Sequence, residues 1–215
     1  MQIRCECGQL RAEIKHFPSE MPGRLACYCD DCQTYLMHIK RTDLFVDGAG
    51  GTEIVPIYPC NLSFSSGTER LTCLRLSPQG IFRWSANCCN TPIANVQPGF
   101  PWIGVFARPY VVEDKHRLDN TFGPIRSGIM GKFARGQKPE GVADKLDFKA
   151  FRSTFPFLLK GFLLRKAKGS PFFHGDGKTP IAEPIVLKKE LREKLRADLS
   201  KIERHSRVHS PSTIS

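Results

Sequence analysis

Long hydrophobic runs are missing from this chain of 215 residues. The longest one, residues 155–164, is about half the length that a membrane-spanning helix needs, and Lys160 interrupts it. The sequence therefore predicts no transmembrane segment. No apolar run stands ahead of the first cysteines either, so we expect no secretory signal peptide and a reducing, cytoplasmic location.

The usual catalytic signatures are absent as well. The sequence contains no glycine-rich phosphate loop, no nucleophile elbow and no paired-carboxylate pattern. It therefore gives no support to nucleotide hydrolysis, to a serine hydrolase or to a two-carboxylate mechanism. Internal repeats and low-complexity tracts are missing too, which argues against a repeat architecture.

Acidic residues are scarce in the second part of the chain. Residues 1–125 carry equal numbers of acidic and basic side chains, whereas residues 126–215 carry 20 Lys and Arg against 9 Asp and Glu. The whole excess of +11 therefore lies after residue 125. This division predicts a neutral, cysteine-rich domain over residues 1–125 and a basic extension with helices over residues 126–215. Such an extension can bind nucleic acid, an acidic membrane surface or an anionic substrate, or can be a plain solvated face.

Cysteine, in contrast, is abundant, and seven of the nine cysteines form three tight clusters. They are Cys5 and Cys7, then Cys27, Cys29 and Cys32, then Cys88 and Cys89. Thiolates so close along a chain can share one soft divalent ion, and zinc is the usual one. Disulfides are the alternative, but the short loops within Cys5/Cys7 and Cys27/Cys29 would strain them badly. We therefore predict one or two Zn2+ ions per chain.

Short segments rich in β-forming residues occupy most of the cysteine-rich part. Residues 9–16 alternate cleanly, with Leu10, Ala12 and Ile14 on one face of a half-buried strand. Further strands are expected at residues 24–26, 53–58, 62–65, 70–76, 80–84 and 102–107, with a hairpin turn at Ser66-Gly67. Residues 34–39 fit either a helical turn or a strand. The pattern predicts a mainly β fold, either a sandwich or a folded-over sheet.

After Pro124 the pattern changes towards loops and helices. Residues 127–141 are Gly-rich and basic, which indicates a loop or linker. Residues 147–166 look helical, with breaks expected at Pro156 and Gly161. The last eleven residues are expected to be disordered. The clearest helix is expected over residues 187–204, because one apolar stripe runs through it: Leu187, Leu191, Leu195, Leu199 and Ile202.

The first and third cysteine clusters can together form a closed site. Cys5 and Cys7 stand just before a strand, and Cys88 and Cys89 follow one. Four thiolates from these two segments would make a tetrahedral structural zinc site. Adjacent side chains rarely point at the same ion, so the alternative is that one of the pair is left out, with Cys88 a buried small hydrophobe.

The middle cluster offers only three thiolates, from Cys27, Cys29 and Cys32. Three protein ligands leave a fourth position open, which is typical of a reactive zinc and makes these cysteines the candidate catalytic residues. Zinc with three thiolates carries a net formal charge of about −1, so it favours a soft ligand such as a thiolate over water. The neighbouring Asp30 and Asp31 strengthen that expectation. The alternative is a site closed by a further ligand: Cys60, Cys73, Cys88 or His38.

The three clusters, taken in order, resemble those of a known family. They lie in the segments C-E-C-G-Q-L-R-A-E-I, C-Y-C-D-D-C-Q and F-R-W-S-A-N-C-C-N-T-P-I-A-N. The resemblance is to glutathione-dependent formaldehyde-activating enzymes, a family that includes centromere protein V. It implies a zinc-stabilised fold of small β-sheets folded over each other (a β-tent). It also implies a structural zinc on Cys5, Cys7 and Cys89, and a labile zinc on Cys27, Cys29 and Cys32 near a glutathione site.

The third segment departs from the family pattern. Ala86 stands where the family usually has a cysteine, and Asn90 replaces a glycine, so Cys88 is the nearby substitute ligand. The chain is therefore similar to a divergent branch of the family with a Cys-Cys third cluster.

Two functions fit these observations. The first is a carbon–sulfur lyase-like enzyme that acts on glutathione or another thiol adduct at the three-Cys zinc. The second is a non-catalytic zinc module whose basic residues 126–215 bind nucleic acid or another acidic partner or surface. A labile zinc on Cys27, Cys29 and Cys32 would also suit storage or sensing of the metal.

Overall fold

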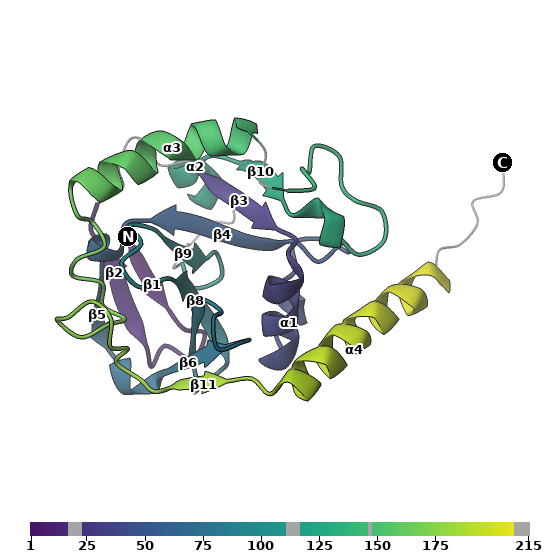
Figure 1. Cartoon of the computed structure of the whole chain (residues 1–215), viewed down its shortest axis with the longest axis horizontal. Coiled ribbons are helices and arrows are strands. Elements are labelled where there is room, and N and C mark those ends of the chain that lie inside the picture. The colour runs from purple at the N-terminus through teal and green to yellow at the C-terminus, as the bar shows by residue number, and fades with distance from the viewer. Residues whose placement is uncertain (17–22, 111–116, 146–147, 209–215) are drawn as a thin grey trace.

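Short strands dominate the fold (Figure 1). The computed structural model describes residues 1–16, 23–110, 117–145 and 148–208. The strands are β1 (Gln2–Arg4), β2 (Arg11–Ile14), β3 (Arg24–Cys27), β4 (Thr52–Ile57), β5 (Leu62–Ser66), β6 (Leu71–Arg75), β7 (Phe82–Ala86), β8 (Thr91–Val96), β9 (Ile103–Phe106), β10 (Ile125–Ile129) and β11 (Pro184–Val186). The α-helices are α1 (Asp30–His38), α2 (Arg117–Phe122), α3 (Phe148–Leu163) and α4 (Lys189–Val208). Short 3-10 helices are η1 (Thr42–Leu44), η2 (Pro59–Asn61), η3 (Thr68–Arg70) and η4 (Gly131–Phe133).

The strands form two sheets, which confirms the mainly β fold class. A three-stranded sheet has the order β1-β2-β5, and an eight-stranded sheet has the order β10-β3-β4-β9-β8-β7-β6-β11. One hydrophobic core joins them, because Leu10, Ala12 and Ile14 of the small sheet belong to the same buried cluster as Trp84 of the large one. The alternation predicted for residues 9–16 is confirmed, since their odd-numbered neighbours in β2 are exposed.

Both edge strands of the large sheet come from the basic part of the chain. β10 lies parallel to β3, and β11 lies parallel to β6. The loop predicted over residues 127–141 is therefore wrong at its start. The exposed edge of β3 offers backbone groups that need partners, and β10 supplies them; Ile129 O, for example, accepts a hydrogen bond of 3.0 Å from Tyr28 N.

The hairpin predicted at Ser66-Gly67 is wrong as well. β5 pairs with β2, whereas β6 pairs with β7, so the chain crosses from one sheet to the other at this point. Gly67 has φ +78°, and a Cβ there would lie 2.1 Å from the carbonyl oxygen of Gln9. The chain at Gly67 therefore approaches Gln9 so closely that a glycine is required there. The dipeptide Ser66-Gly67 alone does not show whether its glycine serves such an approach or a hairpin turn.

Helix α3 runs unbroken through Pro156, contrary to the predicted breaks. Phe157 is buried and stacks on Tyr58 with ring centroids 4.2 Å apart, and the Tyr58 hydroxyl donates a hydrogen bond of 2.8 Å to Phe157 O. Gly161 permits this approach, because a Cβ there would lie 2.9 Å from the Tyr58 ring. Burial of one aromatic side chain contributes about 1.5–3 kcal/mol, which offsets much of the cost of a proline inside the helix.

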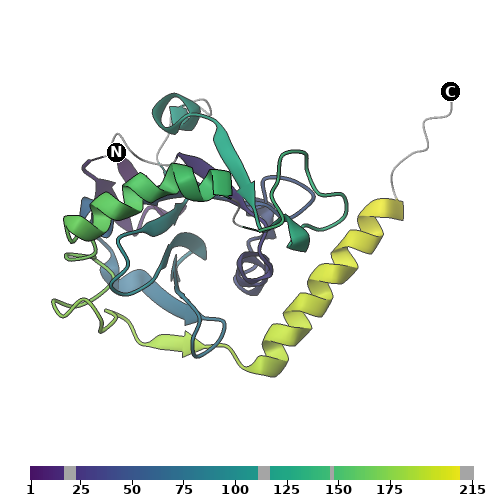
Figure 2. The same cartoon turned by 45° about the horizontal axis from the view of Figure 1, so that its top comes forward.

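Helix α4 packs against α1 (Figures 1 and 2). Of the predicted apolar stripe, Leu187 and Leu199 are buried and Leu195 is half-buried, but Leu191 is exposed; the side chain of Ile202 lies outside the described ones. The helix continues to Val208, so the first part of the predicted disordered tail is helical, and residues 209–215 lie outside the described range. Among the described residues, no helix is both long and apolar enough to cross a bilayer.

Candidate metal centres

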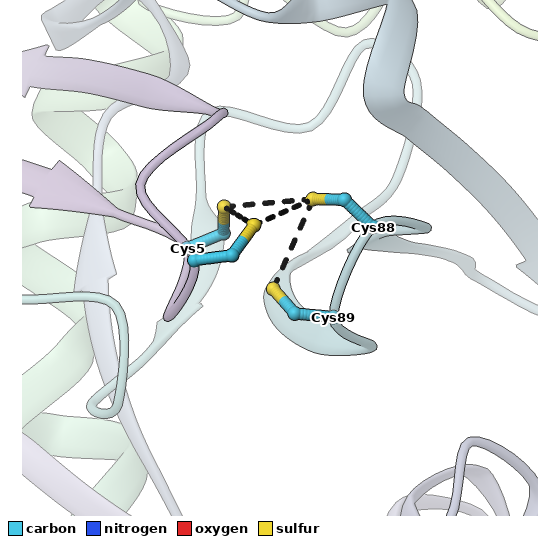
Figure 3. A group of neighbouring side chains, drawn as sticks. Cys5, Cys88 and Cys89 are labelled. Carbon is cyan, nitrogen blue, oxygen red and sulfur yellow. Dashed lines mark hydrogen bonds between the residues drawn. The ribbon is translucent and has the colours of Figure 1, made fainter.

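The first and third cysteine clusters meet in space (Figure 3). Cys5 and Cys7 come from the turn after β1, and Cys88 and Cys89 come from the turn between β7 and β8. All four Sγ atoms lie within 4.8 Å of one another. The Sγ–Sγ distances are 3.5 Å for Cys5–Cys7, 3.7 Å for Cys5–Cys88, 3.2 Å for Cys7–Cys88 and 3.9 Å for Cys88–Cys89. This group, the four-Cys cluster, can hold a metal ion.

The β7–β8 turn brings both adjacent cysteines to this cluster. Asn87 N donates a hydrogen bond of 2.8 Å to Arg70 O, which anchors the start of the turn. Asn90 takes a left-handed conformation with φ 53° and returns the chain into β8. The expectation that either Cys88 or Cys89 is left aside therefore does not describe the geometry. The strand β8 itself was not predicted, because Pro92 interrupts its β pattern; Pro92 lies next to a register shift between Trp84 and Ser85 on β7.

Polar contacts position Cys5 and Cys7, the other two members of the four-Cys cluster. Leu10 N donates a hydrogen bond of 3.2 Å to Cys5 Sγ. Glu6 accepts from Arg41 Nη2 at 2.7 Å and from Arg108 Nε at 2.6 Å, which fixes the turn between Cys5 and Cys7. Burial raises the pKa of Glu6, but these two guanidinium groups outweigh it and lower the pKa below its ordinary value.

Thr91, the first residue of β8, links the two halves. Its Oγ1 accepts a hydrogen bond of 3.0 Å from Glu6 N and lies 3.1 Å from Cys89 Sγ. Burial raises the pKa of the Cys89 thiol, but hydrogen bonds from Thr91 and from the backbone of Cys7 outweigh it and bring the pKa to about 6. The cluster therefore contains one sulfur that ionises readily.

The middle cysteines form a second group around the start of α1. Cys27 ends β3, Cys29 is the N-cap of α1, and Cys32 lies in its first turn, where its N–H donates to Cys29 Sγ at 3.3 Å. The three Sγ atoms lie within 4.8 Å of one another. This three-Cys cluster can hold a metal ion as well. Of residues 34–39, for which helix and strand were both open, residues 34–38 form the rest of α1 and Ile39 is its C-cap.

No fourth ligand joins this cluster among the His, Cys, Asp and Glu side chains that the structure describes. Of the four candidates, Cys88 belongs to the four-Cys cluster and His38 lies at the opposite end of α1. Cys73 is buried within β6, and Cys60 is exposed on η2. All nine cysteines lie in the described part of the chain, and all are free thiols there.

A buried arginine stands beside the three-Cys cluster. Arg83 of β7 places Nη1 3.6 Å from Cys32 Sγ and 3.1 Å from Asn95 Oδ1. Its guanidinium also lies over the Tyr35 ring, 5.5 Å from the centroid. Hydrogen bonds from Cys27 and Cys29, together with the charge of Arg83, hold the pKa of Cys32 well below its ordinary value in spite of burial.

The aspartates beside the cluster are already paired. Arg196 of α4 places Nε 2.5 Å from Asp30 Oδ2 and Nη2 2.8 Å from Asp31 Oδ1. Arg196 therefore compensates the negative charge that Asp30 and Asp31 were expected to add beside the site. Sequence reasoning missed Arg83 and Arg196, although a single arginine inside the apolar strand F-R-W-S-A was a visible anomaly.

A cavity of about 370 Å3 adjoins β4, the strand that pairs with β3. Thr52 on β4 lines it and is the register partner of Cys27 on β3. Thr52 Oγ1 and the Tyr110 hydroxyl, also in the lining, are both buried without a hydrogen-bond partner among the described residues. Arg108 and Glu53 supply charge at the same cavity.

Comparison with known proteins places the chain in a family. The model of a family described as "Family of unknown function (DUF6151)" matches residues 1–185. The chain belongs to DUF6151. The DUF6151 match ends before α4, so the helix that carries Arg196 lies beyond it.

Other comparisons add little to the DUF6151 assignment. No curated protein matches the chain. Among solved structures, a crystal structure of a Rhodobacter sphaeroides protein is similar with a TM-score of 0.42 and 16% identity. The similarity covers 58% of this chain and 97% of that one.

Proposed function

We propose that the protein binds two zinc ions, one structural and one that accepts a small thiol. The observation that carries the proposal is the three-Cys cluster, which has three sulfurs, a buried arginine and no fourth ligand among the described residues. Thiolate-only donor sets suit zinc in preference to hard cations. In the four-Cys cluster, the four Sγ–Sγ distances given above, 3.2–3.9 Å, lie near the separation of about 3.8 Å in a tetrahedron with zinc–sulfur bonds of about 2.3 Å.

Arg83 supports charged sulfur at the second site. A guanidinium stays protonated, and burying it without a negative partner is costly. Among the described residues, the Arg83 guanidinium donates hydrogen bonds to Asn95 Oδ1 and Cys32 Sγ. Zinc with three thiolates has a net formal charge of about −1, which Arg83 would balance. Together, the zinc–thiolate group and Arg83 would have a net charge near zero, so one more anionic sulfur could bind without strong repulsion.

The reaction proposed for this site makes or breaks a carbon–sulfur bond. Zinc would lower the pKa of a thiol that binds in the fourth position. The thiolate sulfur adds to the carbonyl carbon of a small aldehyde, and the oxygen takes up the proton that the thiol has lost; the reverse breaks the same bond. The resemblance to formaldehyde-activating enzymes supports this choice and makes glutathione the thiol to test first.

The cavity beside Thr52 is the proposed place for the rest of the thiol. Its volume falls within the range of small-molecule pockets, about 300–1,000 Å3. Thr52 and Cys27 are opposite each other in an antiparallel pair, so their side chains lie on the same face of the sheet. The two buried hydroxyls of Thr52 and Tyr110 have no hydrogen-bond partner among the described residues, and a polar ligand would supply one.

Metal content and calorimetry test the proposal. Wild type should contain two zinc ions per chain, and Cys29→Ala should contain one. Zinc-loaded wild type should bind glutathione, Cys29→Ala should not, and Tyr110→Phe should bind about 2- to 10-fold more weakly. Tyr28→Phe is the control, because its hydroxyl bonds to Asp47 and does not line the cavity. A two-zinc protein that takes up no glutathione at millimolar concentration would refute the thiol site and leave the structural site standing.

A further inference from the structure

The outer side of α3 and the residue after it expose a run of large apolar side chains. We call this set the α3 stripe: Phe151, Phe155, Leu159, Phe162, Leu163 and Leu164. The first four follow the spacing of one helix face, and Leu163 continues it. Exposure reaches 53% for Phe162, 73% for Leu163 and 55% for Leu164. Phe157, in contrast, is buried against the core, and Leu158 is half-buried.

The segment of sequence that carries the α3 stripe contains no acidic residue. Residues 148–175 include no Asp or Glu. They include six basic residues: Lys149, Arg152, Lys160, Arg165, Lys166 and Lys168. The side chains of Arg152, Lys160, Arg165 and Lys168 are exposed. Exposed apolar and cationic side chains therefore share one segment of chain that carries no negative charge.

The fold holds this surface in a defined orientation. Phe157 and Gly161 fix the inner side of α3 against Tyr58, and a Cβ on Gly161 would lie 2.8 Å from Pro101. Phe100 meets Phe162 edge to face, with ring centroids 5.6 Å apart. Figures 1 and 2 show α3 along the periphery of the molecule. The α3 stripe therefore points outward without any rearrangement.

We propose that the α3 stripe binds the surface of a membrane that contains anionic lipid. Phenylalanine and leucine side chains enter the boundary between headgroups and acyl chains, while Lys and Arg attract anionic headgroups. A second copy of the chain is disfavoured as the occupant, because a symmetric contact would bring two copies of this positively charged segment together. Nucleic acid is also disfavoured, since phosphate contacts would leave the leucines exposed to water.

This inference does not depend on the zinc sites, and it is tested with the full-length, metal-loaded protein. Wild type should sediment with vesicles of phosphatidylcholine containing phosphatidylserine, more weakly with phosphatidylcholine alone, and less as salt rises. The pair Phe162→Ser/Leu163→Ser should lower vesicle affinity by about tenfold or more. The pair Arg165→Glu/Lys168→Glu should lower it by about 25-fold or more, since each cation near the surface contributes about fivefold.

Matched variants elsewhere serve as controls. Ile185→Ser removes an exposed apolar side chain on β11, and Lys188→Glu/Lys194→Glu makes the same change of charge near α4. Both should bind vesicles as wild type does. The proposal fails if wild type does not sediment with any vesicle, or if the controls lose as much affinity as the stripe variants. It also fails if ultracentrifugation shows a dimer that Phe162→Ser/Leu163→Ser abolishes, or if a short nucleic acid displaces the vesicles.

Discussion

The four-Cys cluster joins segments that are 83 residues apart in the chain, whereas the three-Cys cluster takes all its sulfurs from residues 27–32. The two clusters also differ in what the charged side chains near them contact. The charges around the four-Cys cluster fix a turn through Glu6, while those around the three-Cys cluster contact the sulfurs or their neighbouring aspartates directly. A metal in the first cluster would tie distant parts of the chain together, and a metal in the second would mainly use charges that the fold has already arranged.

This contrast separates stability from reactivity. Linking β1 to the β7–β8 turn closes a long loop, so loss of that link should affect the whole domain. The three-Cys cluster sits within one turn of chain whose strand and helix have their own partners in the sheet and in α4. A metal in the three-Cys cluster would therefore exchange more readily, without unfolding the protein.

The largest expected effect is the difference between two single variants, each of which removes one cysteine from one cluster. Cys5→Ala should lower the free energy of unfolding by about 4 kcal/mol or more, because a folded-state metal site is lost. Cys29→Ala should lower it by less than about 2 kcal/mol. Thermal unfolding and metal content measure both. Cys73→Ala is the control for deleting a buried thiol outside the clusters, and equal losses for Cys5→Ala and Cys29→Ala would abolish the distinction.

A smaller effect is expected from Arg83→Met, which keeps much of the side-chain volume and removes the charge. The uncompensated negative charge should weaken zinc binding at the three-Cys cluster by about 10- to 100-fold and leave the other zinc in place. Competition with a chromophoric chelator measures the affinity. Arg75→Met is the matched control, because Arg75 lies on the adjacent strand, stacks on Phe82 and has no contact with the cluster. Unchanged affinity in Arg83→Met would remove the charge argument.

The smallest effect is expected from Arg196→Ala. Its ion pairs with Asp30 and Asp31 are partly exposed, so their loss should cost only about 0.5 kcal/mol of global stability. Relative to wild type, Arg196→Ala should nevertheless exchange its backbone amides faster in α4, with little change in the sheet, because α4 docks on α1 through this side chain. Lys201→Ala, which breaks an exposed pair within α4, should leave the docking unchanged. Equal exchange in the two variants would show that the leucines alone hold α4.

Local patterns predicted much of the fold. Period-two alternation marked β2, and short β-rich segments marked β3 to β7 and β9 to within a few residues. Pairing partners were a different matter. β1, β8, β10 and β11 were not predicted, and Gly67 was assigned to a hairpin. β8, β10, β11 and the loop at Gly67 depend on an edge, a bulge or a loop contributed by residues far away in the chain. In α3, the gain from burying Phe157 overrode the local signal of Pro156.

For the candidate sites, the sequence by itself determined which sulfurs can share an ion, because spacings of two and three residues keep side chains within reach of one another. It could not determine the electrostatics. Arg83 is 51 residues from Cys32, and Arg196 is 165 residues from Asp31. Only the tertiary structure decided which charges surround the cysteines, because charge acts through distance in space and through burial, and neither is written in the order of residues.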